Sequence, residues 1–101
     1  MPVQGFGAIA TAVVSVGASQ APATTVLAAS NLRGRVLLAN VGAATVFLGG
    51  IGSGTGVVSP VNGFPLNAGQ TLELPNIGCA LYGIVASGTN AVRVMTFSGG
   101  A

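Results

Sequence analysis

Turn signals recur about every ten residues along the chain, a spacing typical of small antiparallel β proteins. Asn62-Gly63, Asn67-Ala68-Gly69 and Ser87-Gly88-Thr89-Asn90 are such signals. The runs between them are short and rich in Val, Leu, Ile and Thr, which favour extended backbone. No stretch of about ten or more residues has a clear helical period. The pattern therefore predicts an all-β chain.

The segments between the turn signals predict about seven or eight short strands, which favours an antiparallel β-sandwich or a jelly-roll-like barrel. In the last segment, alternation predicts that Val92 and Val94 face the core and that Arg93 faces away. The run Val36–Leu38 predicts a strand that is buried on both faces. The predicted strands are Gly7–Val16, Ala23–Ala29, Arg35–Asn40, Thr45–Leu48, Gln70–Leu74, Ala80–Ala86 and Ala91–Phe97.

Two connections carry specific expectations. Gly49–Asn62 is rich in glycine, so we expect a loop that is mobile unless something holds it and that orders on docking. Asn62-Gly63 is the commonest pair for a type I′ turn. Ser87–Asn90 has the length of a hairpin loop between the two strands that flank it.

The chain length fits a single domain. Residues 1–7 predict an extended N-terminal arm, in which Val3 and Phe6 could each fill a pocket. Residues 8–97 form the predicted β-sandwich domain, and residues 98–101 a flexible tail by composition.

Charge is nearly absent from the chain. Half of its residues are hydrophobic and only four are charged, namely Arg33, Arg35, Glu73 and Arg93. Ordinary soluble domains carry about 25% charged residues, so a free monomer would have a sticky surface. We therefore expect other protein chains to cover much of it.

The composition argues against several other partners. The best apolar run, Gly7–Ala18, is shorter than the roughly 18 residues of a transmembrane helix and contains polar residues. No positive residue precedes it, so it does not resemble a signal peptide. The arginines are too few for binding driven by phosphate neutralisation. We expect neither membrane nor nucleic-acid binding.

Residues for chemistry are equally scarce. The chain has no His, Asp or Lys, and a metal site would have only Cys79 and Glu73 to use. The glycine-rich run Gly49–Gly56 lacks the Lys and the following helix of a phosphate-binding loop. We expect no catalytic residue, no metal, no cofactor and no small-molecule substrate, and the chain is predicted not to be an enzyme.

Three residues of the domain are candidate contacts with a neighbouring protein chain. Arg35 and Arg93 are either solvated or anchors for carboxylates on a neighbouring subunit. Glu73 could pair with Arg93 across strands. Phe64, set between a glycine and a proline, is a candidate for exposure. With Val3 and Phe6 of the arm, these residues form the predicted contact set.

Three segments of the sequence occur in an order that resembles a known family. They are Asn40-Val41-Gly42 running into Thr45–Gly50, then Asn62–Leu74, then Ala80–Thr89 running into Val92–Val94. Their succession is similar to small β-sandwich virion structural proteins of tailed bacteriophages, especially head-decoration and head-fibre proteins. The similarity covers roughly Val36–Val94.

The resemblance implies an all-β fold without enzymatic activity, attached to a capsid or another virion surface. We expect a capsid decoration (cement) protein on the outer surface of the capsid, with the major capsid protein as partner. We also expect it to form a homo-oligomer, with a trimer favoured. The alternatives are a tail, fibre or head–tail accessory module, or a β-sandwich that binds carbohydrate or the host surface.

Overall fold

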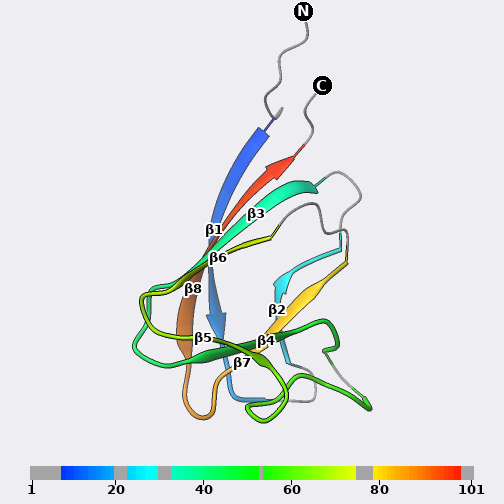
Figure 1. Ribbon diagram of the computed structural model, residues 1–101, viewed down its shortest axis with the longest axis vertical. Coiled ribbons are helices and arrows are strands. Elements are labelled where there is room, and N and C mark those ends of the chain that lie inside the picture. Colours follow the sequence, from blue (N-terminus) through cyan, green and yellow to red (C-terminus); the bar gives the residue numbers. More distant parts are fainter. Residues whose placement is uncertain (1–7, 20–22, 30–32, 53, 75–78, 99–101) are drawn as a thin grey trace, which may run out of the picture.

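The computed structural model describes residues 8–19, 23–29, 33–52, 54–74 and 79–98. All regular secondary structure in these ranges is β-strand, and the strands form two antiparallel sheets of four each (Figure 1). Sheet A has the order β1-β8-β3-β6, and sheet B the order β2-β7-β4-β5. The strands are β1 (Ala8–Val16), β2 (Thr24–Leu27), β3 (Arg33–Asn40), β4 (Val46–Gly49), β5 (Phe64–Leu66), β6 (Thr71–Leu74), β7 (Leu81–Ile84) and β8 (Asn90–Ser98). The all-β prediction is confirmed, and the arrangement is compatible with a β-sandwich.

The strand pairing is nested along the chain. The first strand pairs with the last, β2 with β7, β3 with β6, and β4 with β5, all antiparallel. The two sheets are completed by the pairs β3·β8 and β4·β7. Most of the fold is therefore held by contacts between residues far apart in sequence.

One hydrophobic core lies between the two sheets. Sheet A contributes Val36, Leu38 and Val92, which are fully buried, and sheet B contributes Val46 and Leu66 among others. The predicted alternation of the last strand is confirmed, because Val92 and Val94 are buried whereas Arg93 is exposed. Burial of each such side chain contributes about 1.5–3 kcal/mol.

Two asparagines are buried where the core meets the turn after β3. Asn40 is 1% exposed and Asn90 6% exposed, and the Asn90 Nδ2 donates to the Asn40 Oδ1 at 2.7 Å. The Asn40 Nδ2 donates to the carbonyls of Ala44 and Leu66, each at 2.8 Å. The Gly42 N–H donates to the Asn40 Oδ1 at 3.1 Å. This network joins β3 and β8 of sheet A to β5 of sheet B.

The connection to β5 differs from the sequence prediction. Phe64–Leu66 form a strand, β5, that was not predicted and that pairs with β4. The predicted type I′ turn at Asn62-Gly63 is wrong. That turn needs positive φ at both central residues, and Gly63 is not among the glycines with positive φ. Instead its N–H donates to the Ser59 carbonyl at 2.8 Å. A long packed loop, rather than a two-residue turn, brings β4 and β5 together.

The hairpin predicted at Ser87–Asn90 is also wrong. This connection leaves β7 in sheet B and enters β8 in sheet A, so its two flanking strands are not paired with each other. The Val85 N–H after β7 donates to the Gly17 carbonyl at 3.1 Å, beyond the end of β1. Val85 and Val92 are then both buried in the one core between the sheets. A short loop fits a crossing between packed sheets as well as it fits a hairpin.

Candidate interaction surface

The outer face of sheet B is covered by the chain's own loop between β4 and β5. Val58 in this loop is 3% exposed and packs with Ala23 and Ile84 in a second hydrophobic cluster. Phe47 and Tyr82, both partly buried, complete it. The glycine-rich loop is thus packed on its own domain, in contrast to the expected segment that orders on docking.

Glycines let this loop lie close to the sheet. A Cβ on Gly52 would lie 2.6 Å from the Tyr82 ring, and one on Gly63 would lie 2.6 Å from the Phe47 Cβ. The Gly52 carbonyl accepts a hydrogen bond from the Ala23 N–H at 2.6 Å. Close packing explains these two glycines.

Replacing Gly63 by alanine is expected to lower the free energy of unfolding by about 1–3 kcal/mol, because the new methyl group overpacks the loop against β4. Gly50 provides a matched control in the same loop, since a Cβ there meets nothing within 4 Å. Gly50→Ala should leave stability within about 0.5 kcal/mol of the unmodified protein. Urea unfolding of the two variants measures the difference. Equal effects would show that close packing does not explain Gly63.

The outer face of sheet A has no such cover among the described residues. In the strand register, Thr11, Met95 and Leu37 lie in one row across β1, β8 and β3, and Val13, Arg93 and Ala39 lie in the next. We call these six residues the outer face of sheet A.

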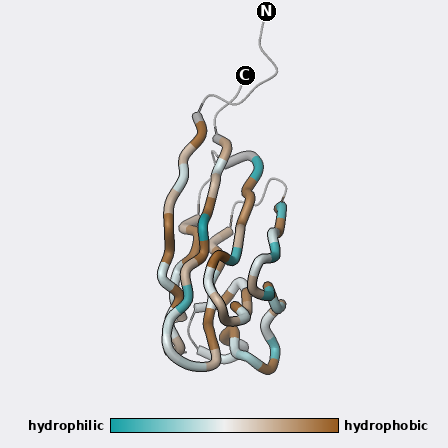
Figure 2. Tube along the Cα trace, turned by 90° about the vertical axis from the view of Figure 1, so that its left-hand side faces the viewer, coloured by the Kyte–Doolittle hydropathy of each residue, from teal (hydrophilic) through white to brown (hydrophobic). Residues whose placement is uncertain are grey.

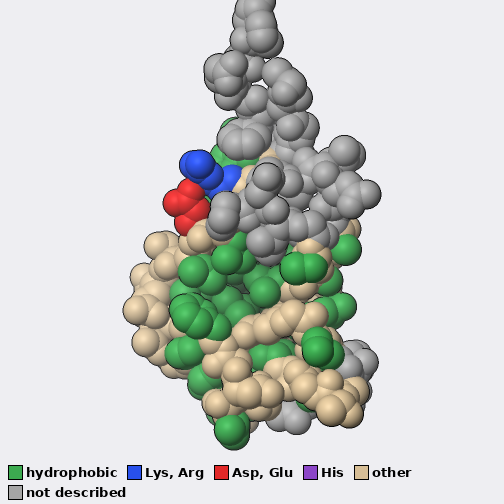
Figure 3. All heavy atoms as spheres, turned by 45° about the vertical axis from the view of Figure 1, so that its right-hand side comes forward, with side chains coloured by type: hydrophobic (Ala, Val, Ile, Leu, Met, Phe, Trp, Pro, Cys, Tyr) green, Lys and Arg blue, Asp and Glu red, His purple; other side chains and the backbone are tan. Residues whose placement is uncertain are grey.

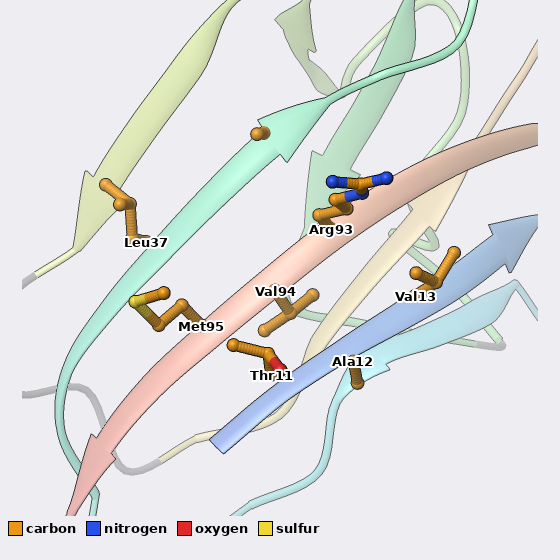
Figure 4. A pocket seen from close by; sticks show the side chains of 8 residues that line it. Thr11, Ala12, Val13, Leu37, Arg93, Val94 and Met95 are labelled. Atoms are coloured by element: carbon orange, nitrogen blue, oxygen red, sulfur yellow. The ribbon is translucent and has the colours of Figure 1, made fainter. Parts of the chain in front are cut away.

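This surface is apolar and hollowed. Val13 is 64% exposed and Leu37 is 37% exposed. The six residues line a depression of about 570 Å³ (Figure 4). The strands of sheet A are mostly brown and pale where Figure 2 turns this side of the molecule to the viewer. The predicted burial of Val36–Leu38 on both faces is therefore wrong for the single chain, since Leu37 points to the uncovered side.

All described charged side chains belong to strands of sheet A. Arg35 and Glu73 form an ion pair with Nε and Oε2 3.0 Å apart, and both are about half exposed. Exposed pairs of this kind contribute about 1 kcal/mol or less. In the view of Figure 3, basic and acidic side chains lie together at one margin, and the remaining described surface is hydrophobic or neutral.

The predicted pairing of Glu73 with Arg93 is wrong. Glu73 lies on β6 and Arg93 on β8, and β3 runs between these two strands. Arg93 instead lies between Val13 and Ala39 in the register. It forms no ion pair with any residue that the structure describes. An exposed guanidinium in an apolar hollow can bind a carboxylate in bidentate geometry.

The structure separates the predicted contact residues. Arg35 and Arg93 belong to neighbouring strands of sheet A, whereas Phe64 belongs to the edge strand β5 of sheet B. Phe64 is 59% exposed, which confirms its predicted exposure. Val3 and Phe6 lie outside the described residues. The apolar residues around Arg93 escaped prediction, because only strand pairing brings β1, β3 and β8 together.

The described residues hold no cluster of three or more His, Cys, Asp or Glu that could bind a metal ion. Among them there is also no helix long and apolar enough to cross a membrane. Comparison with protein-family models finds no match to the chain, and comparison with curated protein sequences finds none either.

Proposed function

We propose that this chain is a virion structural protein of a tailed bacteriophage, namely a capsid decoration protein that binds the major capsid protein on the outer surface of the head. The observation that carries the proposal is the outer face of sheet A. It combines exposed apolar side chains with the arginine Arg93, which has no ionic partner among the described residues. Apolar patches of this kind mark protein–protein interaction sites.

The strand topology supports the same class of protein. We propose that the nested pairing of β1 with β8, β2 with β7, β3 with β6 and β4 with β5 is a jelly roll of eight strands. Jelly rolls occur in viral capsid proteins and also in lectins. This is an analogy of fold, and fold alone does not determine function. The virion role therefore depends on the family resemblance and on the uncovered sheet face together.

The proposed mechanism is mechanical. Each copy bridges neighbouring capsid subunits, and the added interface area resists the pressure of the packaged DNA. A stable interface of ordinary size buries about 800 Å² on each partner. Docking on sheet A needs no change of its backbone, because regular strand pairing already holds its side chains in place.

Cryo-electron microscopy of heads with and without the purified protein tests the proposal. Undecorated heads are mixed with the protein, and copy number and position are read from the density. We expect density on the outer capsid surface, with sheet A turned toward the major capsid protein. Specific density on the tail or fibres alone would favour the accessory-module alternative, and no density on any virion part would overturn the proposal.

Deleting residues 1–7 is expected to reduce the occupancy of the capsid without unfolding the domain. Docking would cost the arm conformational entropy, and burial of Val3 and Phe6 on the capsid would offset that cost. Occupancy is measured by quantitative mass spectrometry of purified particles, and folding by circular dichroism. Undiminished occupancy would contradict the role of the arm and leave the role of sheet A standing.

A further inference from the structure

The two sheets end in four edge strands, and three of them carry features that discourage further pairing. The strand β5 has only three residues and includes Pro65. The strand β2 has four residues and an irregular register between Thr25 and Leu27. The strand β6 has four residues and carries Glu73. Short length, proline, irregularity and charge are the usual means by which proteins protect sheet edges.

The fourth edge strand, β1, has none of these features. It is nine residues long, with the sequence Ala-Ile-Ala-Thr-Ala-Val-Val-Ser-Val, and contains no charged residue and no proline. Its register with β8 runs without a break from Ala8 to Val16. Among the described residues, β8 is its only strand partner. An edge of this kind presents a row of N–H and C=O groups that a further strand can pair with.

We propose that β1 pairs antiparallel with β1 of a second copy, so that two A sheets join into one sheet of eight strands. The length argues for this occupant, since the other described edge strands have three or four residues and would leave half of β1 unpaired. A strand paired with itself about a two-fold axis forms an isologous, closed interface.

Charge does not oppose this arrangement. The β1 strand has no charge, and the nearest described cation is Arg93 on the neighbouring strand β8. Across the proposed β1–β1 interface, the β8 strands of the two copies are three strand spacings apart, about 14 Å. This exceeds the Debye length of about 8 Å at physiological ionic strength, so the two arginines repel each other weakly.

The inference goes beyond the proposed function and specifies a dimer, in place of the trimer expected with the family resemblance. It concerns the edge of sheet A, whereas capsid binding concerns its outer face. Self-association of the purified protein therefore tests it separately from capsid binding.

The experiment compares the unmodified protein with Ala12→Lys, which puts a charge in the middle of β1. Thr25→Lys on the protected edge strand β2 is the matched control, because Thr25 is also exposed. Native mass spectrometry should give twice the mass of one 9.7 kDa chain for the unmodified protein and for Thr25→Lys. Ala12→Lys should give the mass of a single chain, and the dissociation constant of its dimer should be at least tenfold higher.

Hydrogen exchange of the unmodified protein provides a second measurement that needs no variant to fold. The exchange of β1 amides should slow as protein concentration rises, while the amides of β2 and β5 should not change. A monomer at all concentrations, a trimer, or β1 exchange independent of concentration would each overturn the proposal.

Discussion

Asn40→Ala is expected to lower the free energy of unfolding by about 3–5 kcal/mol, since several buried polar groups lose their partners at once. The Asn40 side chain donates to the carbonyls of Ala44 and Leu66 and accepts from Asn90 and from the Gly42 N–H. Each buried group left without a partner costs about 1–3 kcal/mol. Small domains have about 5–15 kcal/mol in total, so the variant should be close to unfolding.

The control for this prediction is Asn67→Ala. The Asn67 Oδ1 accepts a hydrogen bond from the Thr45 hydroxyl at 3.0 Å, but the bond is exposed. Water replaces an exposed bond, and the loss should stay below about 1 kcal/mol. Chemical denaturation followed by circular dichroism gives both values.

A double-mutant cycle with Asn90→Ala separates the network from its single bonds. The two asparagines are in direct contact, so the double variant should be less destabilised than the sum of the single ones, by at least about 1 kcal/mol. If Asn40→Ala and Asn67→Ala had the same small effect, the buried network would not hold β3, β8 and β5 together as described.

From the proposed capsid contact, Arg93→Glu is expected to weaken binding to undecorated heads by at least about 100-fold. Truncating one member of a buried charge pair costs about 2–5 kcal/mol. Here the new carboxylate would also repel the capsid-protein carboxylate that Arg93 is proposed to bind. Arg93 is exposed in the single chain, so the stability of the domain should change by no more than about 0.5 kcal/mol. Loss of binding without loss of fold is the expected combination.

Two further variants sharpen this test. Arg93→Lys keeps the charge but loses the bidentate geometry, and it should retain part of the affinity. Thr55→Glu introduces a negative charge at an exposed loop position away from sheet A, and it should bind as the unmodified protein does. A pelleting assay with purified heads measures all of them. Unchanged binding of a folded Arg93→Glu protein would exclude the outer face of sheet A as the contact surface.

Features that depend on near neighbours in sequence were predictable. Alternation alone assigns Val92, Arg93 and Val94 to their faces, because successive strand residues point to opposite sides. The turn predicted at Asn67-Ala68-Gly69 is present, with the Gln70 N–H donating to the Asn67 carbonyl at 3.0 Å and Gly69 at a φ of 80°. A positive φ is a local property that glycine accepts without steric cost.

Features that depend on distant partners were not. The strand β5 is a strand because β4 lies beside it, although it is three residues long and contains Pro65. The loop Ser87–Asn90 has a hairpin's length but crosses between the sheets. The Asn40–Asn90 contact joins residues 50 positions apart, and neither asparagine carries a local sign of burial.

The sequence by itself determined that this chain is all β and which side chains within a strand share a face. Those properties follow from backbone preference and from the two-residue period of a strand. Only the tertiary structure decided that Arg35 and not Arg93 is the partner of Glu73, that the glycine-rich loop covers sheet B, and that the face around Arg93 stays open. Each of these depends on the order of the strands in the sheets, which nested long-range pairing sets and which no local pattern encodes.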